Sequence, residues 1–256
     1  MYITIGQIES LKSQLRKDYK KIIALVPHPS LFKEMQQLAE DYRHLQWQAA
    51  SVTIDSSAAT LNVTNLASLS SQHLPTGIKN LYPNLKIIKN LPVEHVTVEE
   101  LLKQAELTQE ENNTLYLETN GQEEEIFKQL IDQRKLHLFS EIQVRVGEEP
   151  LYDKSSTSKK IIQLLQKQAY LFQTQKQVDP EHLFLTFNLN KNLHETKKLL
   201  AKVEADTKEL RERYSEKVRS EQELKKLIQE LQLKLQAALD FYQKLEQDYP
   251  QLLQKL

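Results

Sequence analysis

The stretch YITIGQIES, residues 2–10, begins the chain and determines how the rest of it is interpreted. It joins a short apolar run to a glycine, and a second apolar run, KIIALV at 21–26, follows. A strand, a glycine and a second strand in this order are typical of the first βαβ unit of a nucleotide-binding fold. Gly6, however, is the single glycine of a loop that usually carries two or three. The second strand ends in Val26, where an acid would normally bind a ribose.

The composition limits the classes of protein that the chain can represent. Its 256 residues carry a formal net charge of −1, so no basic excess indicates nucleic acid binding. The absence of cysteine excludes disulfides, thiolate metal sites and a cysteine nucleophile, and it fits a reducing compartment. No signal peptide and no apolar run of about 18 residues is present, so we expect a cytoplasmic protein without a transmembrane segment. Only four glycines occur, which leaves Gly6 as the anchor of at most one phosphate-type loop.

Residues 1–189 alternate between short apolar runs and helical patterns, which predicts a first, α/β domain. Strands that alternate with helices indicate βαβ units around a mostly parallel, Rossmann-like sheet, here closed by an antiparallel hairpin. The expected strands are 2–5, 21–26, 47–54, 59–63, 85–98, 114–119, 136–146, 169–175 and 182–188. The expected helices are 7–19, 30–43, 99–106, 123–134 and 157–168.

Residues 190–256 follow a different pattern and form the second predicted domain, a coiled-coil helix. A heptad repeat with position a at Leu193 and position d at Thr196 keeps its register to the end of the sequence, and fifteen of its nineteen a and d positions are apolar. A strict seven-residue period predicts a left-handed supercoil, here about 95 Å long. The side chains expected to hold the homo-oligomer together are Leu200, Val203, Leu210, Leu224, Ile228, Leu231, Leu235 and Leu245.

The alternative for this segment is a helix packed on its own domain or folded into a helical hairpin. The narrow stripe and the length favour the intermolecular coiled coil. Lys217 and Glu221 occupy successive core positions, where charged residues cost stability but can fix register and oligomeric state. Pro250 should disturb or end the helix. The number of strands and their orientation remain open.

Several short motifs follow one another along the first domain. They are Thr4, Gly6, Gln7 and Ser10 in the first loop, VPHP at 26–29, SLSSQHLP at 68–75, YLETNGQE at 116–123 and PLY at 150–152. In this order they resemble landmarks of the FkbM-type family of S-adenosylmethionine-dependent methyltransferases, over about residues 1–188. That family has D-x-G-A-x-x-G in its first loop and E-P-x-P after its second strand. The resemblance implies a Rossmann-like methyltransferase fold.

The chain departs from this family at the positions where the resemblance places the cofactor. Thr4 carries no charge where the family has an acid, and Gln7 and Ser10 place side chains in a loop that should be bare. Val26 cannot accept a hydrogen bond from the ribose. Each unpaired hydroxyl costs about 1–3 kcal/mol, and two lost contacts weaken binding by about 10²–10⁴-fold. We therefore expect a degenerate site, at Thr4, Gly6, Gln7, Ser10 and Val26, that binds no cofactor.

Two acids remain as alternative catalytic residues. Glu118 ends a buried strand, and ligands of parallel sheets bind at the carboxyl ends of strands. Glu123 begins a helix, where Glu123–Glu125 are better explained as a solvated first turn that the helix dipole favours. His28 is interpreted as a turn residue. No histidines have metal-binding spacing and no G-x-S-x-G motif occurs, so we expect no metal site.

These patterns favour a non-catalytic, oligomeric interaction or scaffold protein built on a methyltransferase-like domain. By analogy with the family, which acts on sugars and polysaccharides, its context would be glycan or natural-product assembly. The alternative is an active S-adenosylmethionine-dependent O-methyltransferase with an unorthodox cofactor site and Glu118 as its polar group. A different ligand in the same crevice, such as a nucleotide sugar, is a third possibility.

Overall fold

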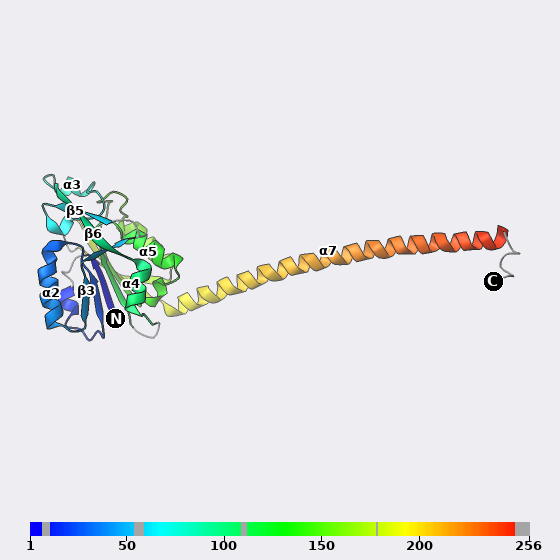
Figure 1. The fold of residues 1–256 in the computed structure, drawn as a ribbon, viewed down its shortest axis with the longest axis horizontal. Coiled ribbons are helices and arrows are strands. Elements are labelled where there is room, and N and C mark those ends of the chain that lie inside the picture. The colour runs from blue at the N-terminus through cyan, green and yellow to red at the C-terminus, as the bar shows by residue number, and fades with distance from the viewer. Residues whose placement is uncertain (7–10, 54–58, 109–111, 178, 249–256) are drawn as a thin grey trace. The chain divides into compact units, whose positions relative to one another are not determined.

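The computed structural model describes residues 1–6, 11–53, 59–108, 112–177 and 179–248, and every statement below refers to these residues (Figure 1). The chain divides into two compact units, Met1–His194 and Glu195–Leu256. The first is an α/β unit and the second belongs to one long helix.

The described part of the first unit is built on a seven-stranded sheet with the order β3-β2-β1-β7-β8-β10-β9. Its strands are β1 (Tyr2–Gly6), β2 (Ile22–Leu25), β3 (Leu45–Gln48), β7 (Thr114–Glu118), β8 (Glu141–Val146), β9 (Tyr170–Gln177) and β10 (Leu183–Leu189). Only β10 runs antiparallel to its neighbours, β8 and β9. The predicted mostly parallel sheet and its closing hairpin are therefore confirmed. The strand order reverses beside β1, which lies between β2 and β7.

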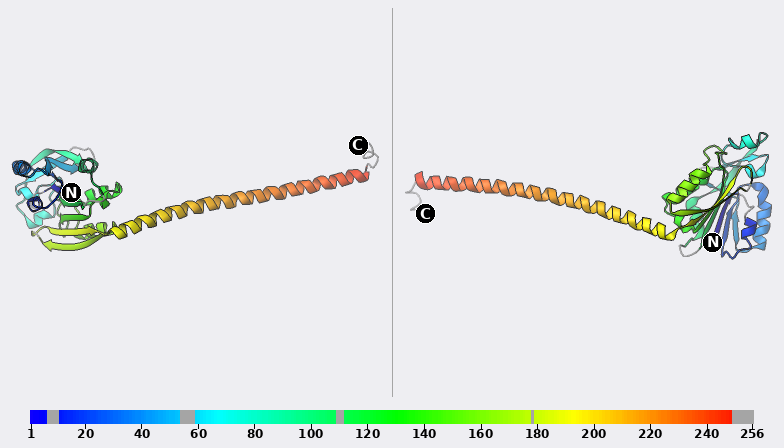
Figure 2. Two further views of the ribbon diagram at one scale, coloured as in Figure 1. Left: turned by 90° about the horizontal axis from the view of Figure 1, so that it is seen from below. Right: turned by 180° about the vertical axis from the view of Figure 1, so that it is seen from behind.

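Helices cover both faces of this sheet, as parallel sheets require (Figures 1 and 2). On one face Ile3 and Ile5 pack in a buried cluster with α4 (Val98–Ala105), α5 (Glu123–Asp132) and α6 (Ser158–Lys167). On the other, Tyr2 packs with α1 (Leu11–Gln14) and α2 (Phe32–Asp41). The alternation of side chains along β1 thus supplies two cores.

A smaller sheet, with the order β4-β6-β5, lies next to the carboxyl edge of the main one. Its strands are β4 (Ala50–Thr53), β5 (Ala59–Thr64) and β6 (Ile87–Thr97). Ala50 and Val52 join the core cluster of the main sheet, and the short elements η2 (Ala67–Leu69) and α3 (Ile78–Leu81) connect β5 to β6. This sheet supplies one wall of the candidate site.

Three predicted elements differ from the structure. The single strand expected at 47–54 is divided between β3 and β4, which belong to different sheets. The strand expected at 136–146 is wrong in its first part, where Leu136–Leu138 forms the 3₁₀ turn η3. Leu136 and Phe139 are both buried, and residues three apart in a strand would point to opposite faces. The Tyr170 hydroxyl lies 2.7 Å from both of their carbonyl oxygens and stabilises the turn by a hydrogen bond. The helix expected at 7–19 appears only as α1, and residues 7–10 lie outside the described residues.

The helix α7 (Lys191–Asp248) is continuous over 58 residues, or about 87 Å. Its continuity excludes a helical hairpin within these residues. Along it, seam side chains such as Leu210 and Leu231 are 64% and 56% exposed in the single chain. The coiled coil itself remains a prediction, and Pro250 lies outside the described residues. None of the described helices has both the length and the apolar character needed to cross a membrane.

Candidate functional site

The candidate site is a narrow crevice at the carboxyl edge of β1, β2 and β7, where the strand order reverses. Ligands of open α/β sheets bind at such a point. The cavity volume of the crevice is about 20 Å³, which is space for little more than one water molecule. Its lining is Ile5, Gly6, Pro27, His28, Ser51, Leu61, Ser70, Ser71, Gln72, Glu118, Thr119 and Gln122.

Gly6 has a structural role that the sequence alone does not reveal. It lies in register with Glu118 on β7, and its φ of +108° is one that residues with a Cβ rarely adopt. A Cβ built on Gly6 would lie 1.8 Å from the carbonyl oxygen of Glu118. The space left by the missing side chain is therefore filled by the backbone of β7, which explains the glycine without a ligand.

Two other residues of the predicted degenerate site are buried. Thr4 is 1% exposed, and its hydroxyl has no hydrogen-bond partner among the described residues. Val26 is also 1% exposed and packs with Tyr2 and Met35 in the core on the α1–α2 face. The chain after β2 therefore offers an apolar side chain at the position where the sequence resemblance places the ribose. Gln7 and Ser10 lie outside the described residues.

His28 caps the 3₁₀ turn η1 (Pro29–Leu31), as expected of a turn residue. Its Nδ1 accepts a hydrogen bond from the Ser30 amide at 3.2 Å and lies 2.7 Å from the Ser30 hydroxyl. Burial lowers the pKa of the ring, so we expect it to be neutral at pH 7. Its Nε2 is buried and has no hydrogen-bond partner among the described residues, although His28 lines the crevice.

Glu118 is the acid of the crevice, and its carboxylate is held by two neighbours. The Tyr116 hydroxyl donates to Oε2 at 2.5 Å, and Arg145 Nη1 donates to Oε1 at 2.5 Å. The side chains of Glu118 and Arg145 are only 5% and 9% exposed. Arg145 Nη2 also forms an ion pair with Asp179. The three charged residues form a chain that joins β7, β8 and the segment before β10, in which Glu118 and Arg145 are buried and Asp179 is partly exposed.

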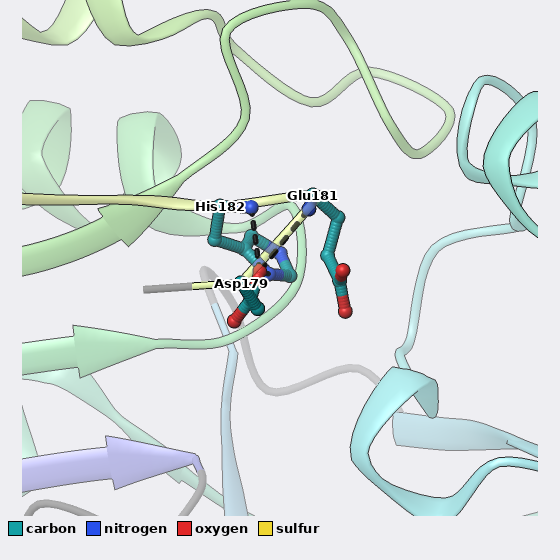
Figure 3. A group of neighbouring side chains, drawn as sticks. All are labelled: Asp179, Glu181 and His182. Carbon is teal, nitrogen blue, oxygen red and sulfur yellow. Dashed lines mark hydrogen bonds and ion pairs between the residues drawn. The ribbon is translucent and has the colours of Figure 1, made fainter. Parts of the chain in front are cut away.

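Asp179, Glu181 and His182 form a group whose potential ligand atoms all lie within 4.8 Å of one another (Figure 3). Asp179 Oδ1 accepts hydrogen bonds from the amides of Glu181 and His182, at 3.2 and 2.7 Å. It also lies 3.2 Å from His182 Nδ1. Because the guanidinium of Arg145 already contacts this carboxylate, a metal cation would be repelled. We interpret the group as the stabilised turn of the β9–β10 hairpin.

This group is absent from the predictions made from the sequence, although DPEH at 179–182 places three potential ligand side chains in one short segment. His182 is buried, and burial followed by the charge of Arg145 lowers its pKa to about 4. The ring is therefore neutral near pH 7.

Glu123 does not belong to a solvated helix turn, and that expectation is wrong. It is 3% exposed, and its carboxylate accepts hydrogen bonds from the Thr119 amide and hydroxyl, both at 2.9 Å, and from the Gly121 amide at 3.0 Å. Burial raises its pKa although these hydrogen bonds act in the opposite direction. Glu123 thus closes the loop between β7 and α5.

Glu124 is also buried rather than solvated. Burial alone would raise its pKa. Contacts with Lys128 at 2.7 Å, Lys160 at 2.8 Å and the Ser156 hydroxyl outweigh burial and lower the pKa to about 2. The carboxylate joins the start of α5 to α6 and is fully committed to structure.

Three of the motifs found in the sequence meet around the loop after β7. Asn120 donates to the carbonyls of Ser68 and Ser70 at 2.8 and 3.0 Å, and Ser71 donates to the Asn120 carbonyl at 2.6 Å. The Tyr152 hydroxyl donates to a carbonyl of the same serine-rich segment at 3.2 Å. The motifs at 68–75, 116–123 and 150–152 are therefore explained by mutual packing of three connections.

Comparison with known proteins adds a distant likeness. No model of a known protein family matches the chain, and no curated protein matches it. Among solved structures, the chain is similar to fibrillarin from Aeropyrum pernix, whose structure is described as a complex with natively bound S-adenosyl-L-methionine. The TM-score is 0.39 and the identity 10%, over 73% of this chain and 65% of that one. The fold assignment given above depends on the sheet order and direction and not on this likeness.

Proposed function

We propose that this chain is a non-catalytic, methyltransferase-like protein that α7 assembles into a homo-oligomer, and that its α/β unit serves as an interaction module or scaffold. The observation that carries the proposal is the state of Glu118, the best-placed acid of the crevice. Its two carboxylate oxygens are engaged by Arg145 and Tyr116.

A general base needs a lone pair directed at the substrate and a pKa near the working pH. The Arg145 guanidinium stabilises the charged form of Glu118 and occupies one of its oxygens. Glu123, the second candidate acid, is buried and bonded to its own loop. Both acids are therefore better suited to holding loops than to moving protons.

The residues around the crevice also fit S-adenosylmethionine poorly. Val26 is packed in the core, so its position supplies no acceptor for the ribose, and the backbone of β7 fills the space beside Gly6. The loss of ribose contacts corresponds to about 10²–10⁴-fold weaker binding. We propose that the domain binds no cofactor.

Calorimetric titration of the full chain with S-adenosylmethionine tests this part. We expect no binding heat up to millimolar ligand. Micromolar affinity that is lost in Glu118→Gln would instead support the alternative, an active O-methyltransferase with an unorthodox site.

The assembly part of the proposal is supported by the exposed seam of α7. Leu231 lies at position d and Leu233 at position f, and both are largely exposed in the single chain, at 56% and 72%. An isolated helix would tolerate aspartate equally at either position. A coiled coil would tolerate it only at Leu233, because position f faces away from the seam.

Light scattering on Leu231→Asp and Leu233→Asp therefore forms a matched pair. We expect the wild type and Leu233→Asp to be oligomers of equal mass, and Leu231→Asp to dissociate toward the monomer. Monomeric wild-type protein at micromolar concentration would contradict the assembly. Following the family that the sequence resembles, we place the function beside enzymes of glycan or natural-product assembly.

A further inference from the structure

The seam of α7 has an internal symmetry that bears on how two copies pair. In the described part of the helix, Lys217 at d and Glu221 at a are the charged residues among the a and d positions, and they lie two residues to either side of Arg219. The seam itself extends from Leu193 to Leu245, and its midpoint is also Arg219.

If α7 forms the coiled coil proposed above, on which this step rests, we propose that two copies pair antiparallel about a two-fold axis at Arg219. In that register every a residue faces a d residue of the second copy. Lys217 of each copy then faces Glu221 of the other, and two opposite-charge layers form at the centre. A parallel, in-register pair would place Lys217 against Lys217 and Glu221 against Glu221. Buried like charges are strongly unfavourable, whereas paired ones are tolerated.

The sizes of the apolar side chains point to the same register. In the antiparallel pair Tyr242 faces Thr196, and Leu200 faces Ala238. A large residue is thus matched with a small one at each of these layers. In a parallel pair each of these residues would face its own copy. The layer with two tyrosines would then be too large, and the layers with two threonines or two alanines would be too small. Close packing without voids favours the first arrangement.

Residues at the e and g positions beside the seam contribute less to the choice of register, but they add one apolar pair. Leu199 and Phe241, both at g and both 63% exposed in the single chain, lie opposite each other in the antiparallel register. The charged flanks do not discriminate. Antiparallel pairing brings Asp206 near Lys234 but Arg211 near Lys225, and parallel pairing brings Asp206 near Arg211. Exposed pairs of this kind contribute little to stability.

Lys225 is moreover engaged by Glu221 of its own helix at 2.7 Å. In the antiparallel pair Glu221 would lie between this lysine and Lys217 of the second copy. The N-terminal ends of the two seams would then be about 80 Å apart. The two α/β units would therefore be attached at opposite ends of the rod.

Spin labelling tests this register without altering the seam. The chain has no cysteine, so Ala205→Cys, Arg219→Cys and Asp240→Cys each provide a single label on the outward f positions. In the antiparallel pair the two labels at 205 are offset by about 42 Å along the rod and those at 240 by about 63 Å. With the separation of about 25 Å across the pair, pulsed dipolar spectroscopy should give about 49 Å between the labels at 205 and about 68 Å between those at 240. The labels at 219 lie in one layer, within about 25 Å.

The outcomes separate this inference from the proposed function. Short distances at all three positions would mean a parallel coiled coil, which overturns the antiparallel register and keeps the assembly. The absence of dipolar coupling at all three, together with a monomeric mass, would overturn the assembly itself. A shift in register of one heptad changes the distances at 205 and 240 by about 10 Å and would also refute the pairing of Lys217 with Glu221.

Discussion

Replacing Arg145 with methionine tests whether the buried charge chain is structural. The substitution keeps a long apolar side chain but leaves Glu118, whose side chain is 5% exposed, without its cation. Breaking a buried ion pair from one side costs about 3–5 kcal/mol, because a desolvated charge remains. The Asp179 side chain is 21% exposed and can be reached by water, so we assign most of the loss to Glu118.

A double-mutant cycle isolates this contribution. Glu118→Gln keeps an acceptor for the Tyr116 hydroxyl and removes the charge, so Arg145→Met combined with Glu118→Gln should lose clearly less stability than the two single changes together. We expect a coupling free energy of about 2 kcal/mol or more. The exposed ion pair between Lys12 and Glu34, with side chains 62% and 38% exposed, is the control, and Lys12→Met should cost less than about 1 kcal/mol.

Urea unfolding followed by Trp47 fluorescence is the appropriate assay. Trp47 is the single tryptophan, it lies in β3, and its ring packs 5.7 Å from that of Phe32, so its signal reports on the α/β unit and not on α7. If Arg145→Met costs no more than Lys12→Met, the ion pair contributes nothing to the fold. Glu118 would then be available for chemistry, which would contradict the proposed non-catalytic domain.

Two further predictions concern single positions. The pKa of His182 is about 4 in the folded state and ordinarily about 6.5, so the unfolded chain binds more protons between these two pH values. The free energy of unfolding should therefore fall by up to about 3 kcal/mol as the pH decreases from 6.5 to 4. In a series of urea unfolding curves at different pH, His182→Gln should flatten this decrease. Gly6→Ala should lower the free energy of unfolding by at least about 3 kcal/mol in the same Trp47 assay, because the new Cβ would overlap the Glu118 carbonyl. A loss of less than about 1 kcal/mol would show that the ends of β1 and β7 can separate.

Much of the α/β fold could be predicted because its elements are marked locally. Alternating apolar runs identify strands such as β1 and β7, and the change to a seven-residue period marks the start of α7. The smaller sheet could not be derived this way. The pairing of β5 with β6 joins segments separated by η2 and α3, and nothing in either segment specifies the other.

The site could be predicted only where a residue's own chemistry decides its role. Val26 is apolar, so the absence of an acceptor at the end of β2 follows from the sequence. The engagement of Glu118 does not, because its partner Arg145 is selected by the register of β7 against β8. The solvated helix turn predicted for Glu123 is wrong for a similar reason. An acid in a first helical turn is usually solvated, but Asn120 and Gly121, both with positive φ, fold the preceding loop over it.

One electrostatic rule connects the two units of the chain. In the α/β unit, buried charges are balanced within the chain: Arg145 lies between Glu118 and Asp179, and Lys160 reaches Glu124 from the next helix. Desolvated charges require such partners. In α7 the same requirement applies to Lys217 and Glu221 once the seam is buried. Two copies satisfy it when each helix turns its lysine toward the other's glutamate, so the antiparallel sense that we propose for the coiled coil rests on the same rule as the structural role that we propose for Glu118.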